Sequence, residues 1–353
     1  MSEIDAVRAL LTEKPRPVGW AERRQRLDEV GSVWPVADDV KLAAVDLDGV
    51  PGEWSIVPGS NPARVLMFFH GGGYCSGSIV SHRRMVTEAG RAGGMRTLAV
   101  GYRLAPEHPF PAALEDATTA WRFLRKLGVA ARNIAIGGDS AGGGLTVALL
   151  TRLRDAGEDL PGCAWLVSPW TDLTMSGSTL STKEAVDPLI HKAYLCELAD
   201  AYVPARIDRK DPRFSVLYAD LQGLPPMLIQ VGSAETLLDD ATRFAGAAGS
   251  ADVSVTLEIW PHMIHAWQLW NARLELGRRA LVSAGAFLRA TSDRASTAGR
   301  RRSDARSSQL NTTICRTASP RCSRSKPALM SSSRRRSVSS RSMGRRPRRN
   351  SPR

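Results

Sequence analysis

Residues 133–155 read NIAIGGDSAGGGLTVALLTRLRD, and this stretch decides how the rest of the chain is interpreted. The apolar run Asn133–Ile136 predicts a buried strand, and the run Ala141–Asp155 predicts a helix shortly after it. Between them stands the pattern G-x-S-x-G, with a glycine two residues either side of Ser140. Such a turn strains its central residue and exposes the side chain at a helix N-terminus, where the dipole favours negative charge. We therefore expect Ser140 to be a nucleophile. No lysine follows to make the alternative, a phosphate-binding glycine loop.

Apolar runs bounded by glycine and proline alternate with amphipathic stretches on both sides of this segment. Strands separated by helices need crossover connections, which produce a parallel sheet covered by helices on both faces. We therefore predict an α/β fold, whose sites form outside the carboxyl ends of the strands. The other predicted strands are Val65–Phe69, Thr97–Tyr102, Ala164–Val167, Met227–Val231 and Val253–Ile259, and the other predicted helices are Ala112–Leu127, Leu237–Ala248 and Arg273–Leu288.

Two segments interrupt this alternation, residues 1–40 and about 172–220. Both are rich in polar and aromatic residues, and we expect them to form a helical cap over the strand ends. Residues 41–290 would then be the core, with the second cap segment inserted into it. With 353 residues, 43% of them apolar, the chain can bury a large core, which excludes a wholly disordered or fibrous protein.

The net charge of +13 belongs to the end of the chain. Residues 291–353 hold 18 of the 48 basic residues and 2 of the 35 acidic ones, which leaves the rest of the chain with a charge of −3. This tail is rich in Ser and Arg and has no aromatic residue, so we predict that it is disordered. It could bind phosphates of nucleic acid or anionic lipid, but a dispensable extension, such as an out-of-frame readthrough, is the favoured interpretation.

Cysteine usage and hydropathy bear on the compartment. The five cysteines are odd in number, widely spaced and without a zinc-binding pattern, so we expect a reducing, cytoplasmic environment. The N-terminus carries two acids in its first five residues and has no apolar core of signal-peptide length. No run of about 18 apolar residues occurs, so we expect no membrane span.

Oxyanion donors are predicted in the sequence His70-Gly71-Gly72-Gly73, which follows the strand Val65–Phe69. Three glycines at a strand end let backbone N–H groups approach a ligand oxygen without side chains in the way. We assign the oxyanion donors to Gly72 and Gly73, joined by Ala141 after the nucleophile. His70 is expected to orient this turn by hydrogen bonding.

The acid is expected after the strand Met227–Val231, because in this kind of fold the order along the chain is Ser, then Asp or Glu, then His. Glu235 stands in the loop, whereas Asp239 and Asp240 follow a pair of leucines where a helix begins. We favour Glu235 over Asp239 on loop position alone.

The base is expected after the final predicted strand, where both His262 and His265 occur. His265 lies deeper in the loop and just before the last helix, so we favour it as the group that accepts the Ser140 proton. Glu235 would hold the imidazole in the required tautomer.

Six blocks of this sequence, in order and with suitable gaps, resemble the bacterial hormone-sensitive-lipase-like branch of the α/β-hydrolases. They are HGGGY (70–74), GYRLAPEHPFPAALEDA (101–117), NIAIGGDSAGG (133–143), SPWTDLT (168–174), LPPMLIQVGSAETLLDD (224–240) and HMIHAW (262–267). The resemblance covers about residues 30–290. It implies an α/β-hydrolase fold with a helical cap and a serine carboxylesterase activity.

Carried over residue by residue, the family's nucleophile falls on Ser140, its acid on Glu235 and its base on His265. The oxyanion donors fall on Gly72, Gly73 and Ala141. Many members carry Asp where this chain has Glu, which is an accepted variant in the family.

The expected reaction is acyl transfer from a short-chain ester to Ser140 and then to water, without metal or organic cofactor. Nucleic acid is not expected to be needed, and a homodimer is possible by family analogy. Two alternatives are an inactive relative that binds a small ligand in the same pocket, and a nucleic-acid-associated or membrane-associated protein that works through its tail.

Overall fold

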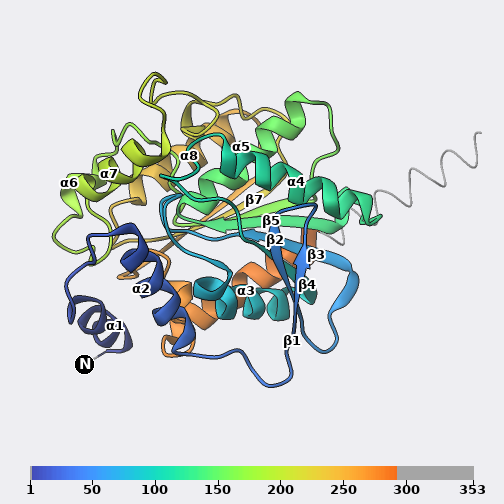
Figure 1. The fold of residues 1–353 in the computed structure, drawn as a ribbon, viewed down its shortest axis with the longest axis horizontal. Helices are drawn as coiled ribbons and strands as arrows, with labels where there is room; N and C mark the ends of the chain where they lie inside the picture. The colour runs from blue at the N-terminus through green and yellow to red at the C-terminus, as the bar shows by residue number, and fades with distance from the viewer. Residues whose placement is uncertain (1, 292–353) are drawn as a thin grey trace, which may run out of the picture. The chain divides into compact units, whose positions relative to one another are not determined.

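The computed structural model describes residues 2–291, which form an eight-stranded sheet with helices on both faces (Figure 1). The strand order is β1-β2-β4-β3-β5-β6-β7-β8. β2 pairs antiparallel with β1 and β4, and every other pair is parallel. The predicted mostly parallel α/β fold is therefore confirmed. The strands are β1 (Lys41–Asp46), β2 (Pro51–Ile56), β3 (Asn61–Phe69), β4 (Met95–Val100), β5 (Ile134–Asp139), β6 (Cys163–Val167), β7 (Met227–Gly232) and β8 (Val255–Trp260).

The helices of the described residues connect these strands or lie outside the sheet. They are α1 (Glu3–Thr12), α2 (Trp20–Ser32), α3 (Ile79–Gly93), α4 (Ala112–Lys126), α5 (Ala141–Asp155), α6 (Thr179–Thr182), α7 (Lys192–Tyr202), α8 (Leu238–Ser250) and a last helix over 275–291. Short 3-10 turns occur at Ala131–Asn133, Val216–Tyr218 and Trp267–Trp270. No helix in this part of the chain is long and apolar enough to cross a membrane.

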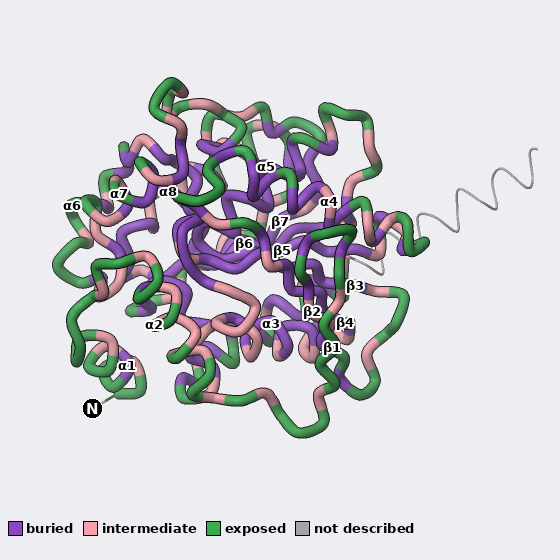
Figure 2. The backbone as a smooth tube through the Cα atoms, in the orientation of Figure 1, coloured by how far each residue is buried: buried purple, intermediate pink, exposed green. Residues whose placement is uncertain are grey.

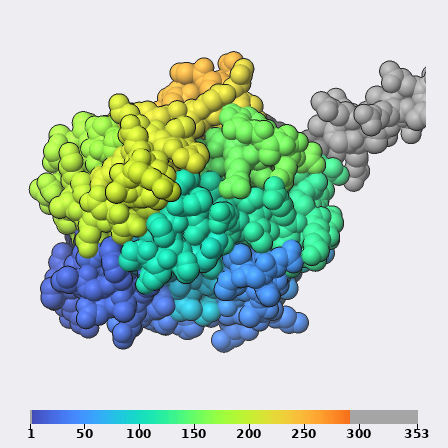
Figure 3. Space-filling model, turned by 45° about the horizontal axis from the view of Figure 1, so that its top comes forward, coloured from blue at the N-terminus to red at the C-terminus, as the bar shows by residue number. Residues whose placement is uncertain are grey.

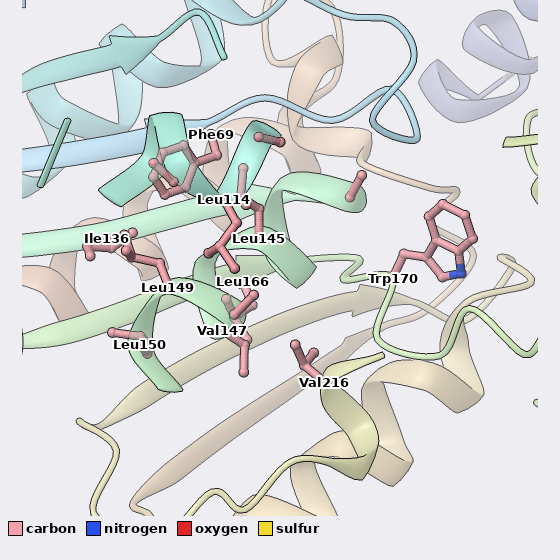
Figure 4. Close-up of a cluster of buried hydrophobic side chains, with 14 of the residues drawn as sticks. Phe69, Leu114, Ile136, Leu145, Val147, Leu149, Leu150, Leu166, Trp170 and Val216 are labelled. Carbon is pink, nitrogen blue, oxygen red and sulfur yellow. The ribbon is translucent and has the colours of Figure 1, made fainter. Parts of the chain in front are cut away.

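The central strands are apolar on both sides because helices cover both faces of the sheet. Along β3, Val65, Met67 and Phe69 face the core that also contains α4, α5 and α8. The alternate residues Leu66 and Phe68 face the core made with α3 and the helix over 275–291. Figure 2 shows the resulting buried central strands, and Figure 4 shows the α5 leucines gathered beside β5.

β1 and β2 were not among the predicted strands, and they form one edge of the sheet. Five of the six residues of β1 are exposed, so its sequence has no alternation of apolar and polar residues. β1 pairs with β2 from Lys41 opposite Ile56 to Asp46 opposite Pro51. Pairing rather than burial makes this strand, which is why hydrophobic periodicity missed it.

The two predicted cap segments contact each other. Arg23 of α2 forms an ion pair with Glu197 of α7, with nitrogen and oxygen 3.0 Å apart. The guanidinium of Arg8 donates to the carbonyl of Val186 at 2.7 Å. Figure 3 shows the blue N-terminal segment beside the yellow-green residues of the insertion.

The last helix is described as far as Thr291. Its predicted range is Arg273–Leu288, and the described part includes Thr291, whose Oγ1 donates to the Phe287 carbonyl at 2.9 Å. The prediction of disorder for the remaining tail falls on residues 292–353, which lie outside the described residues.

Candidate active site

Five loops that follow neighbouring parallel strands carry polar residues at one edge of the sheet. They hold His70–Gly73 after β3, Ser140 after β5, Ser168 after β6, Glu235 after β7 and His265 after β8. These strands are consecutive in the sheet and all run in the same direction. Their carboxyl ends therefore meet at the edge where α/β proteins form their sites.

Ser140 stands between β5 and α5 in a strained backbone conformation, with φ +53° and ψ −119°. The flanking glycines are needed for close packing. A Cβ on Gly138 would lie 2.2 Å from the Gly142 carbonyl oxygen, and one on Gly142 would lie 2.0 Å from that of Phe69. The same packing brings the start of α5 against the end of β3. Ser140 is the N-cap of α5, so it lies at the N-terminus of a helix. It is 5% exposed, so its hydroxyl is in a nearly closed site.

The glycine turn after β3 holds free backbone donors. Gly72 and Gly73 have φ of +109° and +64°, a region that glycine adopts without strain. Within residues 2–291, the amides of Gly72, Gly73 and Ala141 donate no hydrogen bond. The predicted cap insertion lies close to this turn, because a Cβ on Gly73 would lie 2.3 Å from the side chain of Leu198 on α7. Three unpaired N–H groups at the same edge of the sheet as a strained serine can stabilise an oxyanion.

Asp139 connects this turn to the segment that carries Ser140. Its Oδ1 accepts the Gly71 amide at 2.9 Å, and its Oδ2 lies 3.1 Å from Nε2 of His82 on α3. Burial raises the pKa of Asp139, but the charge and hydrogen bond of His82 outweigh that effect and bring the pKa below its usual value. The carboxylate thus fixes Gly71 while the next two amides stay free.

His70 lies in the same turn and contacts Gly71 and Tyr102. Its Nδ1 lies 2.8 Å from the Gly71 carbonyl oxygen, and its ring stacks on Tyr102 at 4.3 Å. Burial and the neighbouring His82 lower the pKa of His70 to about 4. A neutral, packed imidazole of this kind supports the backbone of the turn.

Glu235 and His265 are paired at the ends of β7 and β8. The Nδ1 of His265 lies 2.8 Å from Oε2 of Glu235, and the carboxylate is completely buried. The other candidate acid, Asp239, accepts the amide of Ser178 in the insertion at 2.7 Å. Asp240 accepts two backbone amides at residues 171 and 172. Of the three acids, Glu235 is the one hydrogen-bonded to a histidine.

The two histidines after β8 have different surroundings. His262 is exposed, has φ +65°, and donates its backbone amide to Ser233. His265 is 5% exposed. Burial lowers the pKa of His265, but the hydrogen bond and charge of Glu235, with smaller contributions from Asp187 and Asp139, raise it above its usual value. The imidazole is therefore a stronger base than an ordinary histidine.

Sequence reasoning assigned no role to three polar residues at this edge, Asp139, Ser168 and His82. Asp139 immediately precedes Ser140, and Ser168 is the first residue after β6, so position at a strand end could have drawn attention to both. His82 lies inside α3, and only the packing of that helix brings it to Asp139.

Comparisons with known proteins show the fold and the family of this chain. A family model described as the alpha/beta hydrolase fold matches residues 66–269. An acetyl-hydrolase of Streptomyces hygroscopicus is 46% identical over 237 residues, which are 67% of this chain and 79% of the relative.

Solved esterases match over most of the chain. A crystal structure of an esterase from the bacterial hormone-sensitive lipase family has a TM-score of 0.80 and 41% identity, covering 82% of this chain and 99% of that one. The esterase EstE5, in a crystal soaked with p-nitrophenyl butyrate, has a TM-score of 0.80 and 39% identity, covering 83% and 99%.

Proposed function

The chain belongs to the α/β-hydrolase family, in its bacterial hormone-sensitive lipase branch, and we propose that it hydrolyses short-chain carboxylic esters through an acyl-enzyme on Ser140. One observation carries the proposal: a strained serine, three unpaired amides and a Glu–His pair occur at one edge of the sheet. No observation favours the alternative of an inactive ligand-binding relative.

In the first half of the reaction, the Ser140 hydroxyl attacks the ester carbonyl carbon. His265 takes the hydroxyl proton at Nε2, and Glu235 stabilises the imidazolium through Nδ1. The developing oxyanion accepts hydrogen bonds from Gly72, Gly73 and Ala141. The tetrahedral intermediate then expels the alcohol, which leaves with the proton from His265.

In the second half, water replaces the alcohol. His265 accepts a proton from water, and the hydroxide formed attacks the carbonyl carbon of the acyl-enzyme. Collapse of the second tetrahedral intermediate releases the carboxylic acid and returns the proton to Ser140. His265 thus acts as base and then as acid in each half, while Ser140 is the nucleophile in the first half and the leaving group in the second.

The pH dependence follows from the state of His265, which must be neutral to accept a proton. Because its pKa is raised above 6.5, the acidic limb of kcat/KM should have its midpoint above pH 6.5. In Glu235→Gln the charge that raises the pKa is gone, and the midpoint of the residual activity should move down because burial then dominates. The measurement is kcat/KM for an activated ester from about pH 5 to about pH 9. A wild-type midpoint below 6.5 would contradict this assignment.

Two observations support a preference for small acyl groups. The similar acetyl-hydrolase acts, by its name, on acetyl groups, and the similar esterase crystal was soaked with a butyrate ester. In this chain, Leu198 of α7 lies directly over Gly73, so side chains of the insertion crowd the oxyanion turn.

The test is hydrolysis of a series of p-nitrophenyl esters from acetate to palmitate. Turnover should be highest for acyl chains shorter than about eight carbons, because longer chains must displace packed side chains. The same series on a chain ended after Thr291 should give the same profile. Highest turnover on palmitate would contradict the short-chain proposal.

Further features of the protein belong to the same proposal. We propose that residues 1–40 and about 172–220 act as one cap over the core of residues 41–290, and that neither the tail nor nucleic acid takes part in hydrolysis.

The free thiols of Cys75, Cys163 and Cys196 support a cytoplasmic location. Among the described residues, β8 is an edge strand that pairs only with β7, and the exposed side chain of Ile259 on it supports a homodimer.

A further inference from the structure

Ser168 is a second strained serine at the catalytic edge of the sheet. It follows β6, is completely buried, and has φ +43°, in the left-handed region that residues with side chains rarely adopt. Its amide donates to the carbonyl of Gln230 on β7 at 2.7 Å. The backbone strain is thus maintained between two paired strands, which points to a function for this conformation.

The Ser168 hydroxyl bridges the loop of the acid and the loop of the base. It donates to Oε1 of Glu235 at 2.8 Å, and it accepts the backbone amide of Ala266 at 3.1 Å. Ala266 directly follows His265 and has φ +49°. One hydroxyl therefore connects Glu235 with the residue that follows His265.

The carboxylate of Glu235 uses its two oxygens for different purposes. Oε2 contacts His265, while Oε1 is held by the hydroxyl of Ser168 and by the amide of Gly232 at 2.5 Å. Without the hydroxyl, Oε1 keeps one donor and the carboxylate can rotate about its terminal bond. The Ala266 amide also loses its acceptor, which loosens the residue next to the base.

We propose that Ser168 is a positioning residue, which locks the Glu235 carboxylate and the His265 loop in the geometry for proton transfer. This inference rests on the proposed function, in which Glu235 and His265 act on Ser140. Ser168 is completely buried and its hydroxyl contacts Glu235 and Ala266, so its loss should slow the chemical step rather than weaken substrate binding.

The first test is Ser168→Ala, which removes the hydroxyl and keeps the strained backbone. We expect kcat for p-nitrophenyl butyrate to fall about 10-fold to 100-fold with KM changed less than about 3-fold. Ser168→Gly removes the hydroxyl and also relieves the strain, and it should show the same loss. Wild-type kcat in the glycine variant would assign the effect to the backbone and overturn the inference.

A matched control separates this effect from loss of any buried serine. Ser215 is also completely buried, accepts the amide of Leu173 at 2.9 Å and donates to the Arg209 carbonyl, but it lies in the insertion. Ser215→Ala should lower the thermal unfolding midpoint and leave kcat unchanged. An equal fall of kcat in both alanine variants would show that the loss of a buried serine lowers kcat by weakening the fold, and it would overturn the inference.

A proton NMR spectrum gives a second readout. The buried Nδ1 proton of His265, held by Glu235 at 2.8 Å, should give a low-field resonance in the wild-type protein. This resonance should shift or broaden in Ser168→Ala and Ser168→Gly, and stay in place in Ser215→Ala. An unchanged resonance in the Ser168 variants would overturn the inference.

The proposed function is tested separately in the same set. If wild-type protein lacks ester hydrolysis, or if Ser140→Ala retains it, the proposed function fails. If hydrolysis depends on Ser140 but both Ser168 variants keep wild-type kcat, only the role of Ser168 fails.

Discussion

Replacing Ser140 by alanine is expected to lower kcat for p-nitrophenyl esters by about 10⁴-fold to 10⁶-fold without unfolding the protein. The hydroxyl is the one group at this position that can form a bond to the acyl carbon. The amides of Gly72, Gly73 and Ala141 remain in the variant, but donors alone bind the carbonyl and do not attack it. The measurement is kcat by absorbance, with the thermal unfolding midpoint as a check of the fold.

Ser140→Gly is the control for backbone strain. Glycine adopts the φ of +53° found at this position more easily than serine, so the variant should be more stable, by about 1–3 kcal/mol. It should be as inactive as Ser140→Ala, because it also lacks the nucleophile. Turnover in either variant above about a tenth of the wild-type rate would remove Ser140 as nucleophile.

Glu235→Ala is expected to lower kcat by about 10³-fold to 10⁴-fold. The change removes the partner of His265 Nδ1, so the imidazole loses both its tautomer preference and the charge that stabilises its protonated form. Buried and unpaired, the histidine becomes a weaker base. The comparison uses kcat at a pH where the wild-type rate is maximal.

Asp239→Ala is the matched control, since Asp239 stands four residues further along the chain. Its carboxylate accepts the Ser178 amide and lies 3.6 Å from the Arg243 guanidinium. The variant should lower stability through the insertion and change kcat less than about 3-fold. A larger loss of rate in Asp239→Ala than in Glu235→Ala would transfer the role of the acid to Asp239.

The strand-turn-helix around Ser140 could be predicted because its determinants are local. The apolar run of β5, the glycines and the helix of α5 lie within 23 residues, and the helix begins and ends as predicted at Ala141 and Asp155. The glycine turn after β3 was predictable for the same reason. Its free amides are a consequence of three consecutive glycines and of Asp139, which takes up the first amide.

Two kinds of element escaped prediction, for different reasons. β1 has no apolar period, because its residues are exposed and its order comes from pairing with β2. α3 does carry the period of a helix, with Met85, Val86 and Ala89 buried on one side, and Ser78 caps its start. The sequence therefore contains both the helical spacing of apolar residues and the N-cap that would have predicted α3.

The places of Glu235 and Asp239 relative to α8 could be predicted from the sequence, but the contact between Glu235 and His265 could not. α8 begins at Leu238, so Glu235 lies in the loop and Asp239 in the first turn of the helix, as expected. The hydrogen bond from His265 to Glu235 joins loops 30 residues apart, and only packing of β7 beside β8 brings them together. That Glu235 acts as the acid stays a prediction, which the Glu235→Ala and Asp239→Ala variants test.

By itself, the sequence determined the parallel strands of the sheet, the helices α4, α5 and α8, the strained turn at Ser140 and the three-glycine turn, because each depends on residues that are close along the chain. Only the tertiary structure decided that Ser168 bridges Glu235 and Ala266, and that His82 supports Asp139. Those contacts join residues 57 to 98 positions apart. A single hydroxyl or imidazole has no periodic signal in a sequence, and the register and packing of the whole sheet decide what it meets.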